Sequence, residues 1–170
     1  MTTSQSEKAQ GVLAIDVTSR GFGFALFETP TTLIDWGGRT VLPDKEVNTV
    51  KEVQKLLQHH RPKAIILEDH RGSRRCDRMK KIIDEIRKLA ENEHVKCRAF
   101  TMIQVKKVFL SFRAATKDEI ARAIAQQVPT LAPRLPRVRK PWLSEAYGMG
   151  MFDAAALALT YFYSVGARGS

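Results

Sequence analysis

Three carboxylates stand at the ends of the most apolar segments of the chain. Asp16 interrupts one apolar run, Glu68 closes a second, and Asp153 opens a third. An ionised carboxylate beside a hydrophobic core is costly unless a cation or hydrogen bonds compensate it. Carboxylate oxygens also hold divalent metal ions and position them against phosphates. Taken together, the three residues predict a shared cation and a phosphate-bearing substrate.

Each of these carboxylates also has a purely structural interpretation. Asp153 could cap its own helix, because an aspartate in the first turn satisfies free N–H groups and favours the helix dipole. Asp16 could begin a turn with Thr18 and Ser19, and Glu68 could be a solvated strand end. The joint interpretation is stronger, because two adjacent strands and one buried helix would bring the three carboxylates to a single place.

The charge of the protein points to a polyanion as its partner. The net charge is +10 and the sequence pI is about 9.9, which favours nucleic acid or an anionic membrane surface. No basic cluster lies on a helix with the apolar face of an interfacial anchor, so nucleic acid is favoured. Each cluster could also be a solvated face. The clusters are Arg71, Arg74 and Arg75; Arg78, Lys80 and Lys81; Lys106 and Lys107; and Arg134, Arg137, Arg139 and Lys140.

Length and composition predict one intracellular domain. The chain has 170 residues, enough to bury a core without disulfides or a structural metal. Cys76 and Cys97 are widely separated, without the spacing of a zinc site. We expect a polar leader over 1–10, a single domain over 11–165 and a tail over 166–170. No secretion signal or membrane span is expected, so the predicted location is the cytoplasm or nucleoid.

The apolar pattern predicts strands first and helices last. In the first expected helix Val47, Val50, Val53 and Leu57 share one face. A basic, proline-containing connection over 131–141 leads to the last helix. The expected strands cover 11–28 as a hairpin, 32–42, 64–67 and 95–100. The expected helices cover 44–61, 77–93, 116–128 and 151–163, with a short helical segment at 103–109.

Four of these segments together resemble the RuvC family of Holliday junction resolvases. They are Ala14–Val17, Ile65–Glu68, Gln104–Lys107 with Thr116–Ile120, and Asp153–Leu159. The similarity extends over most of the chain, and the set is specific although no single motif is. The resemblance implies an α/β, RNase H-like fold, with a mixed central sheet of five strands flanked by helices in the order β-β-β-α-β-α-β-α-α. It also implies a homodimer and nicking of two strands of a four-way DNA junction.

The same resemblance assigns roles to individual residues. Asp16, Glu68 and Asp153 would be ligands of Mg²⁺, with two ions about 4 Å apart in each site and Mn²⁺ as a substitute. Lys106 and Lys117 match lysines that assist at the scissile phosphate, where they would stabilise developing negative charge. The alternative is that both lysines are surface residues that touch phosphate nonspecifically.

The sequence departs from the family pattern in three places. Gly150 stands where the family usually has a fourth ligand, and Glu145 is the candidate substitute unless it lies on a helix surface. Arg71 replaces an aromatic residue that often contacts the junction, and arginine can both stack on bases and bind phosphate. The connection over 131–141 looks longer and more basic than in the family, as a DNA clamp or a solvated linker. The residues expected to contact DNA are Arg71, Arg74, Arg75, Lys106, Lys107, Lys117, Arg137, Arg139 and Lys140.

The remaining predictions concern the dimer contact and the alternative functions. The helix at 77–93 is our choice for the dimer contact, because the resemblance places it there and its apolar stripe is broad enough for both core and partner. Two other functions stay open. One is a nuclease of the same fold that acts on RNA–DNA hybrid or flapped DNA. The other is a DNA-binding protein that kept the fold and lost catalysis, which Gly150 keeps possible.

Overall fold

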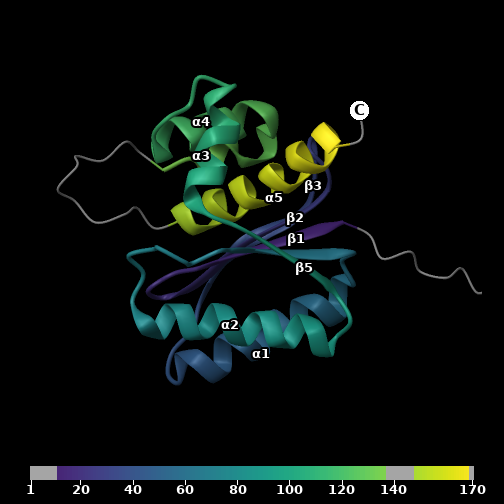
Figure 1. Ribbon diagram of the computed structural model, residues 1–170, viewed down its shortest axis with the longest axis vertical. Helices are drawn as coiled ribbons and strands as arrows, with labels where there is room; N and C mark the ends of the chain where they lie inside the picture. The colour runs from purple at the N-terminus through teal and green to yellow at the C-terminus, as the bar shows by residue number, and fades with distance from the viewer. Residues whose placement is uncertain (1–10, 137–147, 169–170) are drawn as a thin grey trace, which may run out of the picture.

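A mixed five-stranded sheet forms the centre of the protein in the computed structural model, which describes residues 11–136 and 148–168 (Figure 1). The strands are β1 Val12–Val17, β2 Gly21–Thr29, β3 Thr32–Thr40, β4 Ala64–Glu68 and β5 Lys96–Phe100. Their order across the sheet is β3-β2-β1-β4-β5. β1 pairs antiparallel with β2 and parallel with β4. The predicted hairpin and the predicted mixed α/β sheet of RNase H-like type are confirmed.

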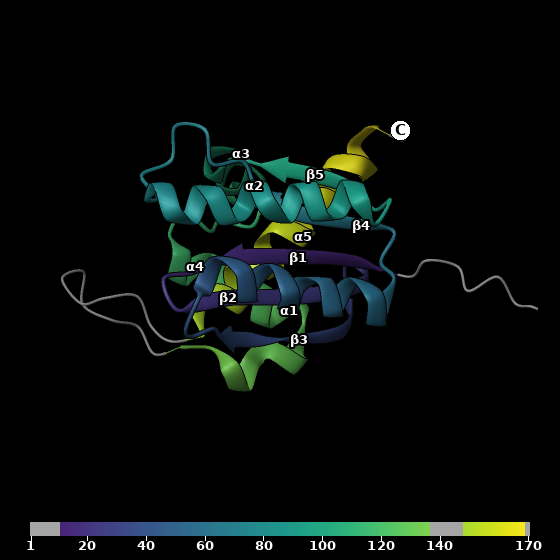
Figure 2. The same ribbon diagram turned by 90° about the horizontal axis from the view of Figure 1, so that it is seen from below.

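Helices cover both faces of the sheet. α1 Lys45–His60 and α2 Asp77–Asn92 pack on one face, and α3 Met102–Leu110, α4 Lys117–Gln127 and α5 Met149–Arg168 lie on the other (Figures 1 and 2). The short segment expected at 103–109 is the full helix α3, so three α-helices follow β5 instead of two. No helix in the described ranges is long and apolar enough to cross a membrane.

The strands next to the centre are buried on both faces, and their alternation decides where the carboxylates point. Leu13 and Ile15 belong to the core under α1 and α2, whereas Val12 and Ala14 belong to the core under α5. Side chains alternate between the two faces of a strand. Asp16 therefore lies on the same face as Ala14, which is the face covered by α5.

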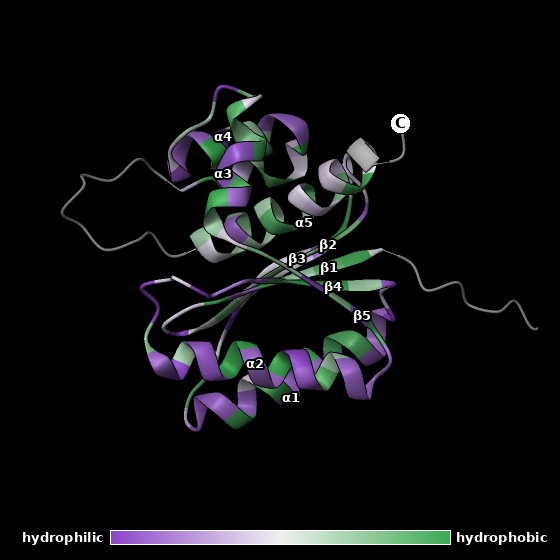
Figure 3. Cartoon of the chain, in the orientation of Figure 1, coloured by the Kyte–Doolittle hydropathy of each residue, from purple (hydrophilic) through white to green (hydrophobic). Residues whose placement is uncertain are grey.

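α5 is the helix that lies deepest in the molecule. Ala154, Ala155, Ala158 and Leu159 are fully buried, because the segment is apolar nearly all round, as expected of a core helix. Figure 3 shows the contrast with α2, which is banded between hydrophilic and hydrophobic colours. α5 contacts β2 and β1 most extensively. A Cβ at Gly150, in the first turn of α5, would lie 3.6 Å from Asp16 Oδ2, so this turn lies beside the end of β1.

Three details of the helices differ from the sequence-based expectations. Val47 is 57% exposed, although we expected it on the buried face of α1. Six residues at 3.6 per turn place Val47 about 120° from Val53 around the helix, so Thr49 takes the buried position instead. Pro129–Arg134 forms a 3₁₀ helix with Leu131 fully buried, where we expected the start of a connection. α5 also runs from Met149 to Arg168, beyond both ends of the expected helix at 151–163.

Candidate active site

The ends of β1 and β4 bring two buried carboxylates together. The parallel register pairs Ala14 with Ile66. Two residues further on, Asp16 near the end of β1 therefore lies beside Glu68, the last residue of β4. Their exposed fractions are 5% and 7%. Both side chains line one pocket on the α5 face of the sheet. Burial of this degree requires compensation of both charges.

α5 adds the third carboxylate. Asp153 lines the same pocket as Asp16 and Glu68, and its side chain is 14% exposed. The helix begins at Met149, and its first turn contains no acidic residue. Asp153 therefore lies beyond the first turn, and the alternative role as a helix cap does not apply.

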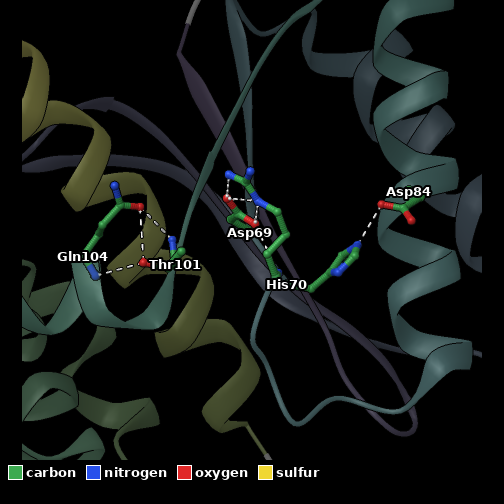
Figure 4. Close-up of polar contacts among 6 residues, drawn as sticks. Asp69, His70, Asp84, Thr101 and Gln104 are labelled. Carbon is green, nitrogen blue, oxygen red and sulfur yellow. Dashed lines mark hydrogen bonds and ion pairs between the residues drawn. The ribbon is translucent and has the colours of Figure 1, made fainter.

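α3 brings Lys106 to the pocket. Its first turn is fixed by a capping box at Thr101 and Gln104 (Figure 4). The Gln104 N–H donates to Thr101 Oγ1 at 3.2 Å, and the Thr101 N–H donates to Gln104 Oε1 at 2.8 Å. Reciprocal caps of this kind fix where a helix begins. They set the position of Lys106 one turn later.

Lys117 reaches the pocket from the start of α4. Thr116 caps this helix by accepting the Glu119 N–H at 3.2 Å, and its hydroxyl lies 3.0 Å from Glu119 Oε1. This cap fixes the start of α4, where Lys117 is the first helical residue. Lys117 Nζ lies 3.2 Å from Asp153 Oδ2. The pocket therefore combines three carboxylates with two lysines, supplied by β1, β4, α5, α3 and α4.

An arginine also reaches this site. Arg75 Nη2 donates to Asp16 Oδ1 at 2.8 Å, Nε donates to Glu68 Oε2, and Nη1 donates to the Val17 carbonyl. Burial alone would lower the pKa of Arg75, but the neighbouring carboxylates of Asp16, Glu68 and Asp153 raise it overall. The sequence placed Arg75 among the DNA-contacting residues and did not reveal this contact. Whether it also touches DNA stays a prediction.

The site has oxygen donors that suit the predicted metal, but Arg75 occupies the oxygens of Asp16 and Glu68. Among residues 11–136 and 148–168, no three His, Cys, Asp or Glu side chains form a group that could hold a metal ion. The guanidinium between Asp16 and Glu68 nevertheless shows that these oxygens accommodate a cation. Hard divalent ions prefer oxygen ligands. By their donor chemistry Asp16, Glu68 and Asp153 would fit Mg²⁺ only if Arg75 vacated the first two.

Gly150 lies close to the carboxylates of the site. A Cβ at this position would lie 2.9 Å from Thr18 Cγ2, 3.5 Å from the Gly23 nitrogen and 3.6 Å from Asp16 Oδ2. The closest of these atoms is the end of a threonine side chain that can rotate away, so the position lacks a ligand because its residue is glycine. Glu145, the expected substitute, lies outside the described residues, as do Arg137, Arg139 and Lys140.

The loop after β4 carries the remaining basic residues. Arg71 is exposed and pairs with Asp69, with Nη2 and Oδ2 2.6 Å apart, which lowers the pKa of Asp69 to about 2. His70 is directed towards Asp84 on α2, with Nε2 and Oδ1 2.8 Å apart (Figure 4). Arg74 is exposed on this loop. Lys107, likewise exposed, lies on α3. Contacts of these side chains with DNA stay predictions.

The apolar side of α2, predicted to contact a second subunit, packs against the core of its own chain. Ile82, Ile83, Ile86, Leu89 and Ala90 are buried against β1, β4 and α1. No large exposed apolar side chain in the described ranges belongs to α2. The large apolar side chains that are exposed lie elsewhere, at Ile34, Leu42, Val47, Ile103, Leu110, Phe112 and Val165. A dimer contact through α2 stays a prediction, and it would have to use mainly polar side chains.

Two solved structures share this fold. One is a Thermus thermophilus RuvC in complex with a Holliday junction substrate, with 19% sequence identity and a TM-score of 0.66 over 92% of this chain and 96% of that chain. The other is a Thermus thermophilus RuvC with 20% identity, a TM-score of 0.66 and the same coverage. No family model matches the chain, and no curated protein sequence matches it either. The likeness establishes the fold.

Proposed function

We propose that this protein is a metal-dependent endonuclease that makes paired nicks in four-way DNA junctions. One observation carries the proposal. Three carboxylates and two lysines from five separate elements line a single pocket at the ends of β1 and β4. Ionisable groups gathered from separate elements into one pocket mark a candidate functional site. The fold shared with a RuvC bound to a Holliday junction supports DNA as that ligand.

The residues of the pocket divide the work by charge. Asp16, Glu68 and Asp153 would hold Mg²⁺ or Mn²⁺, with two ions per site. Bound metal would activate a water and neutralise charge at the scissile phosphate. Lys106 and Lys117 would hold a phosphate oxygen and stabilise the negative charge that develops on it. The ion pair of Lys117 with Asp153 keeps that ammonium at the pocket before DNA arrives.

The surface outside the pocket supports a nucleic-acid partner. The net charge of +10 favours phosphate contacts, which supply much of the affinity for DNA. Arg71, Arg74 and Lys107 are exposed and are the proposed contacts among the described residues. Paired cuts on a two-fold symmetric junction require two sites related by two-fold symmetry, so we also propose a homodimer. A DNA substrate places the protein inside the cell, in cytoplasm or nucleoid.

A second function is favoured by the contacts of Arg75. Because this side chain bonds to both Asp16 and Glu68, the protein could be a DNA-binding member of the fold without catalysis. Gly150 points the same way, since a glycine supplies no fourth ligand. Cleavage distinguishes the two functions, because a purely binding protein retains junction affinity and leaves every strand intact.

The decisive experiment uses a panel of labelled substrates. Four-way junction, duplex, RNA–DNA hybrid and flapped DNA are incubated with the protein, with and without Mg²⁺, and resolved on denaturing gels. The proposal predicts symmetric nicks in the junction that require Mg²⁺. Preferential cleavage of hybrid or flap would reassign the substrate. Binding of the junction with no cleavage in Mg²⁺ or Mn²⁺ would establish the non-catalytic alternative.

A further inference from the structure

Arg75 occupies the position that a metal ion would need. Its guanidinium bonds to Asp16, to Glu68 and to the carbonyl of Val17. The arginine side chain is only 18% exposed, and both carboxylates are buried. The three protein oxygens belong to the ends of β1 and β4, so the guanidinium ties the two strand ends together. In this arrangement the protein supplies its own cation.

The contact imposes competition. A divalent ion that uses the same oxygens must first displace the guanidinium. When the binding-competent state is only partly populated, the apparent affinity falls by that fraction. If Arg75 occupies the site in about 90% of free molecules, metal affinity is reduced about tenfold. A tenfold difference in metal affinity is measurable in the absence of DNA.

The position of Arg75 also gives it an alternative partner. It lies in the loop between β4 and α2, directly after the exposed Arg74 and one residue before the N-cap Cys76. Ser73 Oγ accepts the Arg75 N–H at 3.0 Å, which fixes the backbone of this loop. A guanidinium binds phosphate in the same forked geometry as carboxylate. DNA that enters the pocket beside this loop can therefore compete with the carboxylates for the side chain.

We propose that Arg75 is a positioning residue that couples DNA binding to metal binding. In the free protein it holds the cation position between Asp16 and Glu68, and on the substrate it transfers to a backbone phosphate and releases both carboxylates. The inference rests on the proposed nuclease function. Because coupling between two ligands is reciprocal, DNA should raise metal affinity by the same factor by which metal raises DNA affinity. The benefit is that the site assembles on its substrate.

The first test measures Mn²⁺ binding without DNA, by electron paramagnetic resonance of the free ion. Arg75→Gln should bind Mn²⁺ about tenfold more tightly than the wild type, since the competing cation is gone. Arg78→Gln is the matched control, because it removes the same charge from an exposed position on α2 and should leave the affinity unchanged. Equal Mn²⁺ affinities of the wild type and Arg75→Gln would overturn the inference.

The second test uses the wild-type protein and covers the case in which the variant does not fold. The Nε–H resonance of Arg75 should be protected from exchange in metal-free protein and should shift and lose protection as Mg²⁺ is added. The resonance of Arg78 should not change. If Mg²⁺ binds while the Arg75 resonance keeps its position and protection, the guanidinium does not leave and the inference fails.

The inference and the proposed function fail separately. A protein that cuts junctions but shows no competition between Arg75 and metal retains the function and contradicts the inference. A protein that binds Mn²⁺ more tightly as Arg75→Gln, yet cuts no junction, retains the competition and contradicts the function.

Discussion

The packing of α5 on β2 offers a sharp test of how Asp153 is positioned. Gly23 faces the first turn of α5, where an added Cβ would overlap the carbonyl carbon and oxygen of Gly150 and lie 2.5 Å from the Met151 nitrogen. All three obstacles are backbone atoms. No rotamer change can relieve them, so Gly23→Ala must push the helix away from the sheet.

The expected cost follows from this geometry. Overpacking of a well-packed core lowers the free energy of unfolding by about 1–3 kcal/mol. Because backbone atoms cannot move aside as a side chain can, we take about 3 kcal/mol for Gly23→Ala. For a protein of this size 1 kcal/mol corresponds to roughly 2–4 °C in Tm. Gly23→Ala should therefore lower Tm by about 6–12 °C. It should also lower cleavage in the surviving folded fraction, because the moved helix carries Asp153.

Gly38→Ala is the matched control for this prediction. Gly38 pairs directly with Gly23 across β2 and β3, and a Cβ there would find its nearest neighbour, the Phe22 carbonyl oxygen, at 3.9 Å. The same methyl group is thus added to the neighbouring strand without a clash. Urea unfolding of both variants measures the free energy of unfolding from midpoint and slope. Equal stability of the two variants would refute the close docking of α5 on β2.

Three further predictions concern the loop after β4 and assembly. In the native protein the Asp69 carboxyl should titrate at about 2, against an ordinary value of 3.8, and Arg71→Ala should return it towards that value in an NMR titration. Because the folded pKa is the lower one, the stabilisation is present above pH 3.8 and is lost as the pH falls through about 2. Arg71→Ala combined with Arg74→Ala should weaken junction binding and reduce its salt slope by roughly one unit per lost phosphate contact; an unchanged slope would mark the loop as a solvated face. Sedimentation at micromolar protein should show a C₂ dimer, and a stable monomer that still makes paired cuts would refute the two-fold arrangement.

The sequence predicts the sheet and the positions of the carboxylates well, because both depend on local patterns. Apolar runs that contain Asp16 and Glu68 near their ends mark buried strands. The parallel pairing of β1 with β4 is consistent with the strands β2 and β3 and the helix α1 that lie between them in the chain. Asp153 sits in an otherwise apolar helix, which identifies it as an unusual buried charge. Each of these features is recognisable from the apolar pattern of a few neighbouring residues.

Other features depend on distances that the sequence does not contain. The destination of Arg75 depends on the path of the loop before α2, so its neighbours in sequence, all polar or basic, give no sign of it. The closeness of Gly150 to Asp16 and Gly23 comes from the packing of α5 on the sheet, which joins segments far apart in the chain. Val47 follows the apolar spacing of α1 only approximately. Its angle around the helix, about 120° from Val53, turns its side chain away from the core. The surroundings of Arg75, Gly150 and Val47 depend on how distant segments pack together, which local sequence patterns do not specify.

The most direct test of the account measures junction cleavage and junction binding in parallel for Asp16→Asn. Asp16 is buried at the centre of the site and belongs to the pocket together with Glu68 and Asp153. Loss of a metal ligand should remove strand cleavage in Mg²⁺, while phosphate contacts from lysine and arginine preserve most of the affinity. Glu68→Gln and Asp153→Asn should behave alike. Cleavage by Asp16→Asn at a rate near that of the wild type, with junction binding intact, would contradict the assignment of this pocket as the nuclease site.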